Sequence, residues 1–252
     1  MRLFLLALLA VFSARAQDVM EIVHAYSEHE ASRWDLSRDY TYQYDSIRRT
    51  FKRDGTLKSS TNETYEVLIV DGKPVSRLIQ RDGKPVTDEE ARKRQQQLER
   101  AISQARPVRS IEKQYDSFAL EGEEEIDGRR AWVVSAKKSL FGGIARIHIQ
   151  TRFWIDKADY ECAKVQSEGG MNMISIDGWA HGANSSIVEN MRMAAGVWLP
   201  KHTVFQHAAY LPLTTFPVSI VAQSQAHWEL ETTFSNYKKF QADSHILSLG
   251  KP

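Results

Sequence analysis

The chain has 252 residues, of which 42% are hydrophobic, 10% aromatic and 26% charged. This is the composition of an ordinary globular protein, and it excludes a disordered, collagen-like or coiled-coil chain. Lys and Arg number 33 against 32 Asp and Glu, so the overall positive charge of a typical nucleic-acid-binding protein is missing. We therefore expect no nucleic-acid partner.

The first sixteen residues have the pattern of a secretory signal peptide. Arg2 gives a positive start, residues 3–12 form an unbroken apolar run, and Ala14-Arg15-Ala16 places small residues where a signal peptidase reads. The apolar run is about half of the ~20 residues that a membrane-spanning helix needs. We predict cleavage after Ala16, export of the protein, and a single domain over residues 17–252.

Cysteine usage limits how the exported protein can be stabilised. Cys162 is the one cysteine of the chain, so no internal disulfide can form and the fold has to rely on its hydrophobic core. The residue directly after the predicted cleavage site is Gln17 and not a cysteine, which argues against a lipid anchor at the new N-terminus.

Hydrophobic periodicity predicts two helices. The first begins at Asp18 and ends near Trp34, and the second covers residues 88–105, between Thr87 and Pro107. Each starts with an Asp or Thr followed three residues later by Glu, the pattern of a capping box. The second helix has a thin apolar stripe, which is typical of a helix lying on the surface of a sheet.

Most of the remaining chain alternates between apolar and polar residues, the period of half-buried strands. Asp-Gly pairs separate the strands, as in hairpin turns. At least eight such strands predict a mainly β (α+β) fold, built on a single curved antiparallel sheet or open barrel. We expect residues 210–221, which contain Pro212 and Pro217, to form a long loop, and the Gly142-Gly143 and Gly169-Gly170 pairs to be turns or bulges.

The alternation also predicts one apolar face along the sheet. Two helices, one of them thinly apolar, would fill a large half-barrel poorly, so an apolar ligand cavity is expected. The alternative is that helices fill the concavity and these residues are ordinary core. The predicted inner face carries Tyr40, Tyr42, Tyr44, Tyr65, Val67, Ile69, Trp132, Val134, Phe153 and Ile155.

A search for chemistry finds no catalytic constellation. Neither a Gly-x-Ser-x-Gly nor a His-Glu-x-x-His string occurs. His227, Glu229 and Glu231 share one face of a strand and could bind a divalent cation or support acid–base chemistry. Because Trp228 would face inward, a solvated outer face is the favoured interpretation of these three residues. We expect no catalytic residues, no metal and no cofactor.

Two groups of basic residues could contact anionic headgroups at a membrane surface. Both have acidic neighbours, so an ordinary solvated surface is the favoured interpretation and peripheral membrane contact is left as an option. The groups are Arg48, Arg49, Lys52 and Arg53, and Arg92, Lys93 and Arg94.

Several short motifs resemble those of the LolA-like outer-membrane lipoprotein-sorting proteins (the LolA/LppX type). They are Phe153-Trp154-Ile155-Asp156, Gly196-Val197-Trp198-Leu199-Pro200 and Phe234-Ser235-Asn236-Tyr237. The resemblance covers most of residues 17–240. It implies a periplasmic carrier with a half-open β-barrel whose concave side is covered by helices and holds acyl chains.

The leading hypothesis is therefore a periplasmic, non-enzymatic protein that holds lipid acyl chains or a lipoprotein, with the inner-face residues and Trp228 as lipid-binding positions. A second hypothesis is an envelope regulatory or scaffold module of the same fold that binds a protein partner. A third is an enzyme that uses the face of His227, Glu229 and Glu231.

Overall fold

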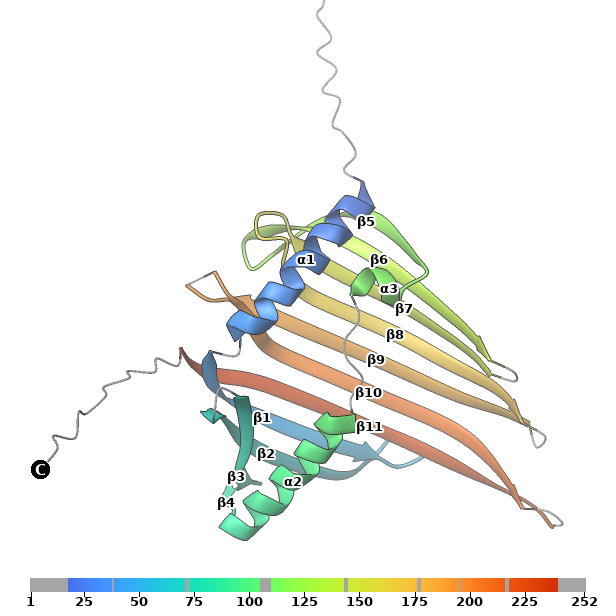
Figure 1. Cartoon of the computed structure of the whole chain (residues 1–252). Coiled ribbons are helices and arrows are strands. Elements are labelled where there is room, and N and C mark those ends of the chain that lie inside the picture. Colours follow the sequence, from blue (N-terminus) through green and yellow to red (C-terminus); the bar gives the residue numbers. More distant parts are fainter. Residues whose placement is uncertain are drawn as a thin grey trace, which may run out of the picture.

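One antiparallel sheet of eleven strands dominates the computed structural model, and three helices lie on the same side of it (Figure 1). The structure describes residues 18–37, 39–70, 73–104, 110–142, 145–175, 178–194, 196–215 and 218–239. The predicted signal peptide, residues 1–16, lies outside this range. The prediction of one curved, half-open antiparallel sheet is confirmed.

The helices are α1 (Val19–Ser37), α2 (Asp88–Gln104) and the short α3 (Ile111–Gln114). The caps predicted from sequence are present, because Asp18 Oδ1 accepts a hydrogen bond from the Met20 amide at 2.9 Å. Thr87 Oγ1 likewise accepts one from the Glu90 amide at 3.3 Å. The first helix continues about one turn beyond its predicted end.

The strands follow one another as an up-and-down meander with one long-range pairing. They stand in the order β4-β3-β2-β1-β11-β10-β9-β8-β7-β6-β5. Because β1 pairs with β11, the first and the last strand of the chain lie side by side within the sheet. The bounds are β1 (Tyr40–Phe51), β2 (Leu57–Val70), β3 (Lys73–Arg81), β4 (Lys84–Pro85), β5 (Ser117–Ile126), β6 (Arg129–Gly142), β7 (Ala145–Asp156), β8 (Cys162–Ser175), β9 (Gly178–Arg192), β10 (Trp198–Thr215) and β11 (Val218–Lys239).

The predicted long loop at residues 210–221 is wrong. Strand β10 continues to Thr215 and β11 begins at Val218, so most of this stretch is a β-hairpin. Beyond Tyr210, β10 pairs with β11 alone, because its pairing with β9 ends there. Pro212 lies in this singly paired part of β10, and such edge positions are where a sheet accommodates proline.

The Gly169-Gly170 pair is likewise neither a turn nor a bulge. Both glycines lie within β8, in regular register with Ile149 and His148 of β7. A Cβ at Gly170 would come within 2.6 Å of the His148 ring. The glycine therefore makes room for an imidazole that lies flat across the neighbouring strand.

The hydrophobic core sits beneath α1 and α3. Ile22, Val23 and Tyr26 of α1 are buried against the sheet, together with Ile111 of α3. Their partners on β6, β7 and β8 are Trp132, Val134, Ala136, Phe153, Ile155 and Cys162. This end of the half-barrel is consequently closed by packed side chains.

Candidate functional site

Strand register defines the concave face of the sheet. Residues paired across neighbouring strands point to the same side of a sheet. Val134 and Phe153 are such a pair, and both pack under α1, so their side is the concave face. The adjacent row on the same face crosses six strands from β7 to β1. It consists of Thr151, Ser167, Ser186, Phe205, Leu230 and Arg48.

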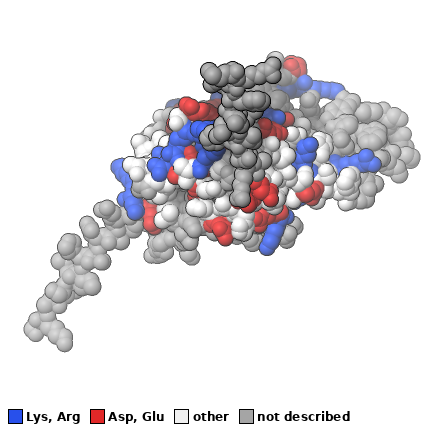
Figure 2. All heavy atoms as spheres, turned by 90° about the horizontal axis from the view of Figure 1, so that it is seen from above, with Lys and Arg blue, Asp and Glu red and all other residues white. Residues whose placement is uncertain are grey.

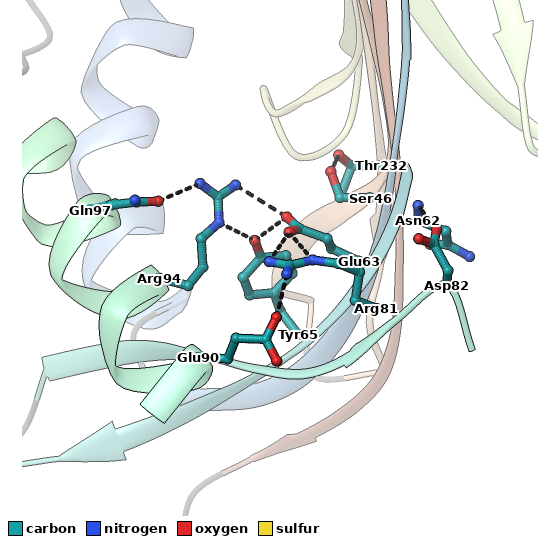
Figure 3. Close-up of polar contacts among 10 residues, drawn as sticks. All are labelled: Ser46, Asn62, Glu63, Tyr65, Arg81, Asp82, Glu90, Arg94, Gln97 and Thr232. Atoms are coloured by element: carbon teal, nitrogen blue, oxygen red, sulfur yellow. Dashed lines mark hydrogen bonds and ion pairs between the residues drawn. The ribbon is translucent and has the colours of Figure 1, made fainter. Parts of the chain in front are cut away.

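Helix α2 covers the opposite end of the concave face, over β2 and β3. Its Ala91 is buried, as are Tyr65 and Leu78 on the strands. Glu63 on β2 holds the helix in place: its side chain is 15% exposed and forms ion pairs with Arg81 of β3 and Arg94 of α2, at 3.0 and 3.1 Å. Figure 3 shows both guanidinium groups converging on this carboxylate.

The tyrosine at the centre of this network completes the attachment of α2. Tyr65 Oη donates to Glu63 Oε2 at 2.6 Å and accepts from Arg94 Nε at 2.8 Å. Burial alone would raise the pKa of Glu63, but the bonds from Tyr65 and Arg81 and the nearby positive charges hold it below its usual range. Burial and the bond to Glu63 raise the pKa of Tyr65. Glu63 is thus an anion that pins the helix to the sheet.

An aromatic wall continues from this network towards the centre of the sheet. Tyr44 stacks on Tyr65 with ring centroids 4.6 Å apart, and Tyr42 lies 5.0 Å from Tyr237 and 6.0 Å from Phe234. Burial raises the pKa of Tyr42 and of Tyr44, so these phenols stay neutral. The wall offers an apolar surface with hydroxyl groups at its margins.

Between the two covered ends, the concave face has a groove of about 420 Å³ whose surface is mainly apolar, with polar side chains such as Asn184 and His207 also in its lining. Gly169 and Gly182 occupy positions of this face where other strands carry side chains, which leaves the hollow. The lining side chains include no Asp or Glu. The apolar ones are Ile147, Ile149, Met171, Phe205 and Trp228.

A cation stands at the edge of this groove. The Arg48 guanidinium lies over the ring of Trp228, 5.1 Å from its centroid, in a cation–π contact. Neighbouring Arg49 points to the convex face and forms ion pairs with Glu229 and Glu231 at 2.6 and 2.8 Å. Arg48 has no carboxylate partner among the described residues, so its charge is available at the groove.

The convex face holds the residues that the enzyme hypothesis requires. Glu231 contacts Arg49 and also His202, at 3.2 Å, and the bonds from Arg49 and His202 lower the pKa of Glu231. His227 stacks on Phe51 at 4.5 Å and borders a second, polar hollow of about 520 Å³. No group of three or more His, Cys, Asp or Glu within the described ranges is arranged to hold a metal ion.

Basic and acidic residues are interspersed on the face seen in Figure 2. Of the two basic groups found in the sequence, Arg94 belongs to the network of α2, and Arg92 Nε donates to the Asp88 carbonyl. Lys52 and Lys93 are exposed.

The predicted lipid-binding positions fall into three environments. Trp132, Val134, Phe153 and Ile155 lie in the core under α1. Tyr40, Tyr42, Tyr44, Tyr65 and Val67 form or adjoin the wall near α2, where Ile69 is half-buried. Trp228 alone lines the groove.

The sequence reasoning missed most of the groove. Met171 and Phe205 were not singled out, and Gly169 and Gly182 carry no apolar side chain to find. Ile147 and Ile149 share the face of Phe153 in β7 and also line the groove. These residues come together only because the five strands from β7 to β11 pair one after another.

No protein-family model and no curated protein matches the chain. Among solved structures, a domain from Vibrio parahaemolyticus, described provisionally as an outer membrane lipoprotein-sorting protein, is similar over 86% of this chain and 94% of its own, with 12% identity and a TM-score of 0.35. A DUF1329 family protein from Desulfovibrio piger is similar over 89% and 94%, with 11% identity and a TM-score of 0.31. At such low sequence identity and structural similarity, the function has to be argued from the residues of this chain.

None of the helices within the described ranges has the length and the apolar character that crossing a membrane requires.

Proposed function

We propose that this protein is a non-enzymatic periplasmic carrier that shelters a single lipid acyl chain in the concave groove. The observation that carries the proposal is an apolar hollow, free of carboxylates, on a face whose two ends are closed by helices. Concave, mostly apolar sites with a few polar groups are where small ligands bind. Lipoprotein sorting is the carrier role that the sequence resemblance suggests for such a chain.

The groove is of a size for one chain. Its volume of about 420 Å³ lies in the lower part of the ~300–1,000 Å³ range of small-ligand sites. Burying about fourteen to sixteen CH₂ groups at ~0.8 kcal/mol each would contribute roughly 11–13 kcal/mol before costs. Association costs of roughly 4–15 kcal/mol are subtracted from this figure, and affinity is the difference between the two.

Arg48 favours a cargo with an anionic headgroup. A carboxylate or phosphate beside Trp228 would receive charge-assisted hydrogen bonds from this guanidinium, worth about 1.5–3 kcal/mol. The cation–π contact holds the guanidinium at the groove without neutralising it. An acyl chain in the groove and its headgroup at Arg48 would satisfy both features of the site.

Detergent-free native mass spectrometry and titration with a fluorescent fatty acid test the proposal. Gly182 faces the groove, where a Cβ would lie 3.9 Å from Met171, so Gly182→Leu should fill the hollow and weaken binding at least tenfold. Ala183→Leu, on the opposite face, is the matched control and should bind normally. Equal binding by both variants, or a wild-type protein that takes up no fatty acid, would contradict the carrier function.

The headgroup preference has its own experiment. Hexadecanoic acid should compete with the fluorescent probe about tenfold better than hexadecanol, and Arg48→Gln should remove this difference. Arg49→Gln, which changes the adjacent residue on the other face, should retain it. If the acid and the alcohol compete equally in the wild-type protein, Arg48 is not a headgroup site.

The periplasmic location is proposed from the predicted signal peptide together with the sequence resemblance to periplasmic lipoprotein-sorting proteins. We expect the protein from fractionated cells to begin at Gln17 and to be recovered in the periplasmic fraction. Intact-mass measurement decides this. A full-length, membrane-bound species would refute it.

A further inference from the structure

Near its end, the described part of the β6–β7 hairpin carries two exposed apolar side chains, Leu140 and Phe141, which we call its tip. Phe141 is 76% exposed and Leu140 is 46% exposed. They are consecutive residues of β6, so they point to opposite faces of the hairpin, with Phe141 on the convex side and Leu140 on the concave side. The described part of this hairpin therefore presents an apolar side chain on each of its two faces.

Three basic residues lie on the same hairpin as these two side chains. Arg146 pairs with Phe141 across the hairpin, and its guanidinium lies 5.8 Å from the centroid of the Phe141 ring. Lys137 and Lys138 stand on β6 just behind the tip, and residues 137–149 contain no Asp or Glu. Asp116 Oδ2 accepts a hydrogen bond from the Ser139 amide at 2.6 Å. The hairpin is thus apolar at its end and basic behind it.

We propose that this hairpin is a docking element that inserts its tip into the surface of an anionic lipid bilayer. Phe141 and Leu140 would enter the interfacial layer, and Lys137, Lys138 and Arg146 would contact the headgroups, because apolar insertion with electrostatic attraction is how proteins bind at this interface. Charge complementarity selects the lipid surface as the partner.

The tip is continuous with the groove described above. Leu140 pairs with Ile147 across the hairpin, and Ile147 lines the groove. A chain leaving the bilayer at the tip would meet apolar side chains along this route. The docking proposal does not depend on the cargo, since the hairpin would bind a membrane even if the groove held no lipid.

Vesicle co-sedimentation of the full mature chain tests the docking surface. Vesicles of phosphatidylglycerol and phosphatidylcholine should bind the protein, and pure phosphatidylcholine vesicles should bind it much more weakly. Phe141→Ser combined with Leu140→Ser should reduce binding at least tenfold. Leu120→Ser changes an apolar side chain of β5 that is 38% exposed, and it is the matched control that should bind as the wild type does.

Removing the charges separates electrostatic from apolar contributions. Lys137→Gln, Lys138→Gln and Arg146→Gln should each weaken binding to the anionic vesicles by about fivefold at low salt, with thermal melts close to that of the wild type. Undiminished binding by the Phe141→Ser, Leu140→Ser protein would overturn the proposal. Wild-type binding that is equal for neutral and anionic vesicles would also overturn it, as would a self-association through Phe141 that competes with vesicles.

Discussion

Single residues in this sheet have roles that depend on which face they occupy. Arg48 and Arg49 are neighbours in β1, yet Arg49 is held by Glu229 and Glu231 on the convex face. Within the described residues, the side-chain partner of Arg48 is the ring of Trp228. Of these two adjacent arginines, Arg49 thus forms structural ion pairs and Arg48 is a candidate ligand contact.

Asp156 is the most deeply buried carboxylate of the described residues, and its substitution should destabilise the fold. It is 2% exposed and accepts two hydrogen bonds from Arg129, at 2.6 and 2.7 Å. It also accepts the amides of Ala158 and Asp159, both at 2.9 Å. We expect Asp156→Asn to lower the free energy of unfolding by about 2–3 kcal/mol in urea titrations, since Arg129 loses its buried partner.

The same substitution should change the pH dependence of stability. Burial would raise the pKa of Asp156, but the bonds from Arg129 and the two amides lower it overall. A lowered folded pKa gives stability that is present above the unfolded value of about 4 and is lost as the pH falls. Unfolding of the Asn variant should therefore depend less on pH between about pH 5 and 3 than that of the wild type. Parallel curves would show that Asp156 has an ordinary pKa.

Tyr42 tests the face assignment in β1. Its ring lies in the aromatic wall, 5.0 Å from that of Tyr237, so Tyr42→Asp would place a charge among aromatic rings and should cost about 3–5 kcal/mol of unfolding free energy. Thr41→Asp, on the adjacent residue, should cost below about 1 kcal/mol. Chemical denaturation of the two variants decides the matter, and equal losses would mean that the strand is buried on both sides.

At the scale of elements, the helices are attached to the sheet by different forces. Helix α1 is held by apolar packing of Ile22, Val23 and Tyr26, whereas α2 is mostly polar and is held around Glu63. The polar attachment has directional bonds and few buried methyl groups, so it should open before the rest of the domain does.

Glu63→Ala should release α2 while leaving the sheet largely intact. Arg81 and Arg94 would lose their common carboxylate, and we expect the amides of residues 88–104 to exchange hydrogen at least thirtyfold faster, with smaller changes in β6–β8. Glu90→Gln removes only a half-exposed partner of Arg81 and should have little effect. A uniform increase in exchange across the domain would show that α2 is integral to global stability.

The sequence predicted the local elements better than their lateral assembly. Alternation located β1 and β7, and the residues Asp18 and Thr87 marked the starts of both long helices, because these signals act within one turn or one strand. The length of the β10–β11 hairpin was missed, since prolines and loop-like composition suggested a break where an open edge accommodates them. The groove could not be predicted because it is made of Gly169, Gly182 and residues from five strands whose register is a long-range property.

At the scale of the whole molecule, the position of β11 governs when the fold can form. This strand pairs with β1 on one side and β10 on the other. The pair of Tyr40 and Lys239 joins residues near the two ends of the described sequence. The sheet therefore remains in two parts until the last strand has been synthesised. Such long-range pairing is slow, because its loop-closure entropy has to be overcome before the contacts form.

Truncation at residue 217 should consequently abolish cooperative folding. Without β11, Tyr42 and Tyr44 lose Phe234 and Tyr237, and the long edges of β1 and β10 lose their hydrogen-bonding partner. A chain ending at residue 239 keeps β11 and is the matched control, which should give a single sigmoidal melt by circular dichroism. The shorter chain should show no such transition and should bind the dye ANS. A cooperative melt of the shorter chain would mean that β5–β10 fold independently under α1, and that the two halves of the sheet are separate units joined by β11.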